Sequence, residues 1–203
     1  MISKRKRTPS LDIGHALYLY FFGLSTRCVA KAMFFLHQVR RSHVAIRNWI
    51  QKCRPRKISS KRKKIEEYIV DETLIQVGSE LIWLWVPTES ENRRILVLSI
   101  SKERNMLVAE RFLSGLVRIH GKNPISTDGG TWYPMVCRFL KLKYHLHSLF
   151  EKSLVEGTMQ YVKDRTECFV DYFPCQKAKC KLKHVRNWFN LFVGYYNKEM
   201  LNA

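Results

Sequence analysis

Two aspartates lie where the sequence can place metal-binding carboxylates. Asp71 lies inside an apolar run that is typical of a strand, and Asp128 ends a later run, just before Gly129 and Gly130. A carboxylate in a central strand is costly to bury unless it binds something, and paired glycines allow a sharp turn close to a ligand. Converging carboxylates hold Mg²⁺ or Mn²⁺ ions in metal-dependent phosphoryl transfer. The alternative for Asp128 is an aspartate that only caps the next helix.

A third carboxylate is expected from a helix near the end of the chain. The candidates are Glu151, Glu156, Asp164, Glu167 and Asp171. If that helix begins near Leu154, one face carries a carboxylate and a lysine together, because positions spaced by four, seven and eleven residues nearly superpose. The residues of that face are Glu156, Gln160, Lys163 and Glu167. Such a face could present a ligand for a metal and a cation for phosphate, and the alternative is a solvent-exposed, salt-bridging face.

The runs around these acids predict an α/β domain over residues 67–203. Three strand-like runs rich in β-branched and aromatic residues come first, followed by a helix, a strand, a helix, a strand and two final helices. The expected strands are 65–77, 81–87, 93–101, 123–128 and 143–148, and the expected helices are 105–122, 131–142, 154–171 and 183–197. This is the order of a ribonuclease-H-like mixed five-stranded sheet flanked by helices. The first and fourth strands are neighbours in that topology, so Asp71 and Asp128 could meet.

The first part of the chain predicts a small all-α domain over residues 1–53. Its helices are expected at 11–22, 25–37 and 42–53, with Ser25 and Ser42 as the caps of the last two. The short basic turn between these two helices is typical of a helix-turn-helix. In that geometry the major groove would receive Ser42, His43 and Arg47, and phosphates would meet Arg40 and Arg41. A three-helix packing module without a DNA role is the alternative.

Positive charge dominates the composition. There are 36 Lys and Arg against 17 Asp and Glu, a net charge of +19 that suits a polyanion such as DNA. A basic linker is expected over residues 54–66, where Lys61, Arg62 and Lys63 would follow DNA, and a solvated hinge is the alternative. No apolar run approaches the ~18 residues that a membrane span needs, and the first residues make a poor signal peptide. We therefore expect a cytoplasmic, nucleoid-associated protein without membrane contact.

Five segments of the chain resemble a known family, the insertion-sequence DDE transposases of bacteria and archaea. The matching segments are GLSTRCVAKAMFFL, SHVAIRNWIQK, YIVDET, STDGGTWY and LVEGTMQYVKDRTE, in this order between about Leu11 and about Asn197. In that family a Lys or Arg follows the catalytic glutamate by seven residues, as Lys163 follows Glu156 here. The resemblance therefore implies Glu156 as the third acid, with Glu167 as the fallback. It also leaves only residues 149–153 between the fifth strand and the last catalytic helix.

The resemblance implies an activity and its partners. Such an enzyme binds the terminal inverted repeats of its own element through the helix-turn-helix domain, then cuts DNA and joins it to target DNA. Asp71, Asp128 and Glu156 would hold two Mg²⁺ (or Mn²⁺) ions, while Lys163 would position a phosphate and Arg165 would contact DNA. Synapsis of two ends implies a homodimer or a higher oligomer. The alternatives are a non-catalytic DNA-binding protein, such as a decayed or domesticated transposase acting as a repressor, and a nuclease without joining activity.

Overall fold

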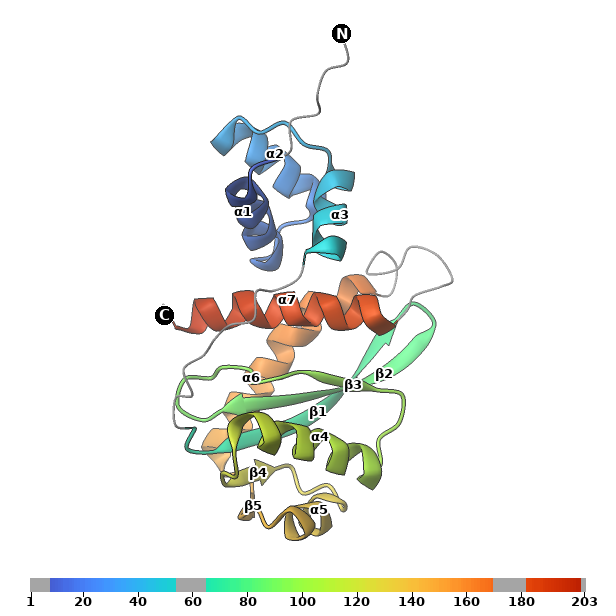
Figure 1. Cartoon of the computed structure of the whole chain (residues 1–203), viewed down its shortest axis with the longest axis vertical. Coiled ribbons are helices and arrows are strands. Elements are labelled where there is room, and N and C mark those ends of the chain that lie inside the picture. The colour runs from blue at the N-terminus through green and yellow to red at the C-terminus, as the bar shows by residue number, and fades with distance from the viewer. Residues whose placement is uncertain (1–7, 54–64, 170–181, 202–203) are drawn as a thin grey trace. The chain divides into compact units, whose positions relative to one another are not determined.

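A computed structural model describes residues 8–53, 65–169 and 182–201. The chain divides into two compact units, Met1–Arg54 and Pro55–Ala203 (Figure 1). The predicted limits of the two domains and of the linker stay predictions. Most of that linker, including Lys61, Arg62 and Lys63, lies outside the described residues.

Three helices form the first unit, as the sequence predicts: α1 (Ser10–Phe21), α2 (Thr26–His37) and α3 (His43–Lys52). Both predicted caps are present. The Ser25 hydroxyl accepts a hydrogen bond from the backbone N–H of Cys28, and the Ser42 hydroxyl accepts one from that of Ala45, each at 3.2 Å. The helices enclose a small apolar core of Ala16, Leu17, Phe21, Val29, Met33, Ile46 and Ile50. Gln38 ends α2 in a left-handed conformation, with φ of 55°, and so begins the turn toward α3.

A mixed five-stranded sheet organises the second unit. The strands are β1 (Tyr68–Val77), β2 (Glu80–Glu89), β3 (Ser99–Ser101), β4 (Ile125–Thr127) and β5 (Tyr144–Leu146), and their order is β3-β2-β1-β4-β5. β1 pairs antiparallel with β2, and β2 with β3, whereas β1 pairs parallel with β4, and β4 with β5. This is the predicted ribonuclease-H-like arrangement, with the first and fourth strands side by side.

The third strand is shorter than predicted. Only Ser99–Ser101 pairs with β2, and Ile95 makes no more than an isolated bridge to Thr88. Backbone hydrogen bonds of 2.9 Å still join Arg94 and Leu96 to β2, and on the outer edge of the segment the Asn197 side chain accepts a hydrogen bond from the backbone N–H of Ile95 at 2.9 Å and donates one to its carbonyl at 2.8 Å. An amide side chain thus takes the place of a neighbouring strand at this outer edge.

Helices cover both faces of the sheet (Figure 1). α4 (Met106–His120) and α5 (Tyr133–Leu140) lie on one face. There they build a core with β1 and β2 that includes Tyr68, Val70, Trp85, Ala109, Phe112, Leu113, Tyr133 and Val136. The other face carries α6 (Leu149–Thr166), the short 3₁₀ helix η1 (Glu167–Phe169) and α7 (Leu182–Met200). Among the described residues, no helix is both long and apolar enough to cross a membrane.

The helix α6 begins five residues earlier than predicted, at Leu149 instead of Leu154. A capping box sets this start. The Ser148 hydroxyl accepts from the N–H of Glu151 at 3.3 Å, and the Glu151 carboxylate accepts from the N–H of Ser148 at 2.6 Å. Residues 149–153 are therefore the first turns of the helix and not a shortened loop, so Glu151 and Glu156 lie on one continuous element.

Candidate metal-binding site on the sheet

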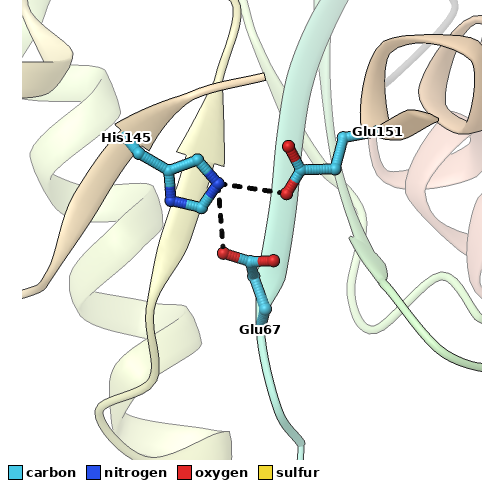
Figure 2. Close-up of side chains that lie close together, drawn as sticks. All are labelled: Glu67, His145 and Glu151. Carbon is cyan, nitrogen blue, oxygen red and sulfur yellow. Dashed lines mark hydrogen bonds and ion pairs between the residues drawn. The ribbon is translucent and has the colours of Figure 1, made fainter. Parts of the chain in front are cut away.

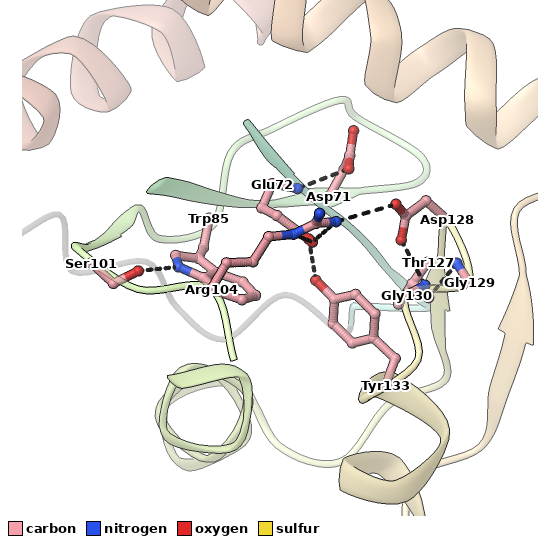
Figure 3. A network of polar contacts seen from close by, with 10 residues as sticks. All are labelled: Asp71, Glu72, Trp85, Ser101, Arg104, Thr127, Asp128, Gly129, Gly130 and Tyr133. Atoms are coloured by element: carbon pink, nitrogen blue, oxygen red, sulfur yellow. Dashed lines mark hydrogen bonds and ion pairs between the residues drawn. The ribbon is translucent and has the colours of Figure 1, made fainter. Parts of the chain in front are cut away.

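Asp71 and Asp128 come together because β1 and β4 are parallel neighbours. The register pairs Val70 of β1 with Thr127 of β4. Asp71 is the next residue within β1, and Asp128 is the first residue after β4. Together with Glu72, they offer carboxylate oxygens that all lie within 4.8 Å of one another (Figure 3). The structure thus brings Asp71 and Asp128 together as the topology predicts, and their role as metal ligands stays a prediction.

Asp71 is held in a setting that disfavours its charge. Burial raises the pKa of its carboxyl group from the ordinary value of 3.8 to about 6, and the carboxylates of Glu72 and Asp128 act in the same direction. A hydrogen bond of 2.8 Å from the backbone N–H of Glu72 to Asp71 Oδ1 works against this, as does the charge of Arg104. A cation bound here would therefore relieve an electrostatic penalty that the protein carries by itself.

Asp128 lies exposed at the start of a glycine turn. The backbone N–H of Gly130 donates to Asp128 Oδ1 at 3.1 Å, which orients the carboxylate. Gly129 adopts a φ of 92°, and a Cβ atom there would lie 3.0 Å from the side chain of Leu146. Both the backbone conformation and the available space therefore favour glycine, as the sequence indicates.

Glu72 points to the opposite side of the strand from Asp71, toward α4 and α5 (Figure 3). Its side chain is fully buried. Arg104 donates to Glu72 Oε1 through Nε at 2.7 Å and approaches it through Nη2 at 2.6 Å, while the Tyr133 hydroxyl donates to Oε2. Both oxygens of Glu72 are thus occupied by protein donors. This network could not be predicted from the sequence, because no local pattern links three residues so far apart in the chain.

The predicted third acid lies on α6. Glu156 and Lys163 are both exposed there, and no carboxylate cluster among the described residues includes Glu156. Glu167, the alternative candidate for the third acid, is exposed in η1. Within η1 the carbonyl of Phe169 accepts a hydrogen bond of 2.9 Å from the N–H of Gly78, at the turn between β1 and β2. Glu167 therefore lies near the far end of the β1–β2 hairpin.

A second group of ligand-type side chains lies on the same face of β1, just before the strand begins. His145 Nε2 lies 3.1 Å from Glu151 Oε1 and 3.4 Å from Glu67 Oε1, and Figure 2 shows the ring between the two carboxylates. Burial raises the pKa of Glu67, and its hydrogen bond to Glu151 and the charge of Glu151 act in the same direction. Burial acts on Glu151 in the same sense, but hydrogen bonds from Ser148 and His145 outweigh it and lower the pKa of Glu151 to about 2.

The predicted DNA-binding residues of the first unit cluster around the start of α3. Arg40, Ser42 and His43 are exposed, and Arg47 is half-buried. Arg41 is partly engaged within the unit, because its Nε donates to the Thr8 hydroxyl at 2.7 Å and its Nη1 to the Arg40 carbonyl at 3.1 Å. In the second unit, Arg165 is half-buried on α6. DNA binding by these residues stays a prediction.

The strand order defines the second unit as a ribonuclease-H-like domain, and Asp71 in β1 and Asp128 just after β4 give it a candidate metal site. The chain belongs to the family of the uncharacterized protein MJ0017 of Methanocaldococcus jannaschii. The two sequences are 31% identical over 181 residues, which cover 88% of this chain and 82% of that protein. No family model matches the chain.

Several solved retroviral structures are similar to the chain at low identity. The catalytic core domain of BIV integrase is 14% identical, with a TM-score of 0.48, over 64% of this chain and 81% of that domain. The HTLV-2 integrase catalytic core domain in complex with magnesium is 17% identical, with a TM-score of 0.40, over 48% of this chain and 66% of that one. A chain of the simian T-cell lymphotropic virus intasome is 18% identical, with a TM-score of 0.43. The similarity covers 71% of this chain but spans only 57% of the intasome chain.

Proposed function

We propose that the protein is a DDE transposase, which binds the inverted repeats of its own insertion sequence and catalyses metal-dependent cleavage and joining of DNA. The observation that carries the proposal is the convergence of Asp71, inside β1, and Asp128, just after the parallel strand β4. A net charge of +19 and a three-helix unit with a capped third helix support DNA as the substrate. The resemblance of the acidic and helical segments to transposases supports the same proposal.

Glu156 is the third acid in this proposal, and the course of α6 along β1 favours it over Glu167. The helix begins with Glu151 beside Glu67 and is followed by Phe169 beside Gly78, so its two ends are fixed against the strand. Along β1, Asp71 lies about a third of the way from Glu67 to Gly78. Along the helical segment from Glu151 to Phe169, Glu156 also lies about a third of the way, if each residue advances by the same distance within its element. Glu167 belongs to the far end, beside the hairpin turn.

The donor set fits Mg²⁺ or Mn²⁺. These hard cations prefer carboxylate oxygens, and Asp71 and Asp128 offer such oxygens beside a group whose ionisation a cation would favour. When bound by these aspartates and Glu156, the metal would activate the attacking oxygen and offset charge on the phosphate. Asp71 would bind the metal in its ionised form, which predominates above about pH 6, and the Gly130 amide orients Asp128. Lys163 would then contact a phosphate of the DNA.

A strand-transfer assay tests the proposal. The substrate is a labelled duplex with the terminal repeats that flank the coding sequence, incubated with target plasmid and Mg²⁺ or Mn²⁺. We expect metal-dependent cleavage and joining by the wild type and none by Asp71→Asn. The matched control is Glu80→Gln, since this glutamate is exposed and pairs with the exposed Lys102 at 3.2 Å. Equal activity in Asp71→Asn, or no metal-dependent joining by the wild type, would contradict the proposal.

A non-catalytic DNA-binding protein is the second candidate. The observation that favours it is the exposed position of Glu156, outside the carboxylate clusters among the described residues. Such a protein would act as a repressor of its element and would bind the terminal repeats without cutting them. Specific binding of the repeats in a gel-shift assay, with no cleavage in either metal, would support the repressor over the transposase.

A further inference from the structure

Arg104 lies at the centre of the polar network behind the metal site (Figure 3). We propose that Arg104 is a positioning residue, which fixes Asp128 relative to Asp71 by holding β1, β2 and the β4–α5 turn together. This inference rests on the proposed function, because it takes the two aspartates as metal ligands. Arg104 itself touches neither metal nor substrate in this proposal.

The first contact joins Arg104 to β1 and α5 through one carboxylate. Arg104 binds Glu72 Oε1 with two nitrogens, at 2.7 Å and 2.6 Å, and Tyr133 donates its hydroxyl to the other oxygen. Glu72 follows Asp71 directly in β1, and Tyr133 begins α5 just after the glycine turn that carries Asp128. A charge-assisted contact to a buried carboxylate holds its partners in one geometry. The strand that carries Asp71 and the turn that carries Asp128 are therefore both connected to Arg104 through Glu72.

The second contact fixes the guanidinium group between two aromatic rings. The Arg104 Cζ atom lies 4.8 Å from the ring centre of Trp83 in β2 and 4.8 Å from that of Trp132. Trp132 lies between the glycine turn and Tyr133, and a Cβ atom at Gly130 would meet its ring at 3.3 Å. The turn that carries Asp128 is therefore packed against the residue that also binds Glu72.

Direct ion pairing to Asp128 does not account for the position of Arg104. Its Nη2 lies 3.8 Å from Asp128 Oδ2, which is too long for a hydrogen bond. Both oxygens of Glu72 already accept from protein donors, although this residue lies within the carboxylate cluster. In this proposal Asp71 and Asp128 bind the metal, while Glu72 and Arg104 do not bind it and keep the two aspartates in position.

A charge effect and a positioning effect have opposite signs, which makes the proposal testable. A cation beside the site repels a divalent metal ion, so a pure charge effect predicts that Arg104→Met binds metal more tightly. A positioning role predicts weaker binding, and it predicts the same for Arg104→Lys, which keeps the charge but loses the planar fork and the stacking between the tryptophans.

The experiment is a titration of the full-length, DNA-free protein with Mn²⁺, with free Mn²⁺ followed by electron paramagnetic resonance. Binding that Asp71→Asn abolishes defines the site. We expect Arg104→Lys and Arg104→Met to raise the Kd of that site at least about tenfold, as for other residues that support metal ligands. The matched control is Arg94→Lys. Arg94 binds buried Glu89 at 2.7 Å and 2.6 Å, in the same geometry but near the opposite end of α4, and we expect an unchanged Kd.

Three results would overturn the inference: an unchanged Kd in Arg104→Lys, tighter binding in Arg104→Met, or an equal loss in Arg94→Lys. The last would mean that loss of a buried ion pair weakens the site only through stability. The proposed function has its own readout in the strand-transfer assay. A wild type that binds Mn²⁺ through Asp71 but joins no DNA would sink the transposase and leave the role of Arg104 intact. If the wild type joins DNA but Arg104→Lys leaves the Kd unchanged, the transposase proposal would stand and the role of Arg104 would be contradicted.

Discussion

Two carboxylate clusters lie close together along β1, and they are satisfied in different ways. In the cluster of Glu67, His145 and Glu151, the ring lies within 3.4 Å of both carboxylates, and Ser148 holds the remaining oxygen of Glu151. In the cluster of Asp71, Glu72 and Asp128, the protein's donors are concentrated on Glu72. Asp71 and Asp128 each accept one hydrogen bond from a backbone N–H.

The difference teaches which carboxylates are available to a ligand. Two acids within a few ångströms repel each other in either cluster, and the protein can offset this with its own hydrogen-bond donors or leave the charge for a metal. The first solution lowers the pKa of Glu151 to about 2, despite its burial. The second leaves burial to raise the pKa of Asp71 to about 6. A density of acidic groups therefore indicates a metal site only where their oxygens are not already used.

The largest expected effect separates the two clusters by activity. We expect Asp128→Asn to lower strand transfer by a thousandfold or more, roughly, because loss of a metal ligand removes several kcal/mol of transition-state stabilisation. Glu67→Gln should keep activity near that of the wild type. Initial rates in Mn²⁺ measure both variants. If Glu67→Gln lost as much activity as Asp128→Asn, the two clusters would have to form one functional site.

The second effect concerns stability and has a defined sign for Glu151. Its folded pKa lies below its ordinary value of 4.5, so its charge contributes stability that is present above about pH 4.5 and lost as pH falls toward 2. We expect Glu151→Gln to lower the free energy of unfolding by about 2 kcal/mol at pH 7.5, since the change weakens a capping box and the hydrogen bond between Glu151 and His145. Urea denaturation measures this difference. Equal stability of the variant and the wild type at pH 7.5 would mean that His145 and Ser148 contribute little.

The sequence predicts the meeting of Asp71 and Asp128 because it follows from element order alone. Once a strand, a hairpin and a crossover helix are recognised, parallel pairing of the first and fourth strands brings their ends together. The start of α6 was also available, since Ser148 and Glu151 have the spacing of a capping box. The expected helix nonetheless began at Leu154, where the apolar pattern resumes.

The contacts behind the site could not be predicted in this way. Glu72 binds Arg104 and Tyr133, which lie 32 and 61 residues away and share no periodic pattern with it. Only the packed fold brings them together. A contact of the same kind joins Asn197 to Ile95 across 102 residues, where the side chain satisfies both backbone groups at the outer edge of that segment. Local patterns therefore predicted the elements and the ligand-bearing ends, whereas long-range side-chain contacts set the remaining detail.

The smallest expected effect has the opposite sign to that of Glu151. The pKa of Asp71 is raised in the folded protein, so its contribution to stability is present below its ordinary pKa of 3.8 and is lost as pH rises through about 6. Above pH 6 the metal-free protein therefore carries a charge that folding disfavours. Asp71→Asn removes that charge and keeps an oxygen that can accept from the Glu72 N–H. We expect it to stabilise the protein by about 1–2 kcal/mol at pH 7.5, discounted for partial exposure.

Thermal unfolding in EDTA between pH 4 and pH 8 measures this effect. The advantage of Asp71→Asn over the wild type should be small at pH 4, grow through pH 6 and level off above it, because only the ionised aspartate is penalised. Saturating Mn²⁺ should reverse the order, since metal binding stabilises the wild type alone. A variant that is less stable than the wild type in EDTA at every pH would show that Asp71 stabilises the fold as Glu151 does. The two clusters would then differ in their residues but not in their roles.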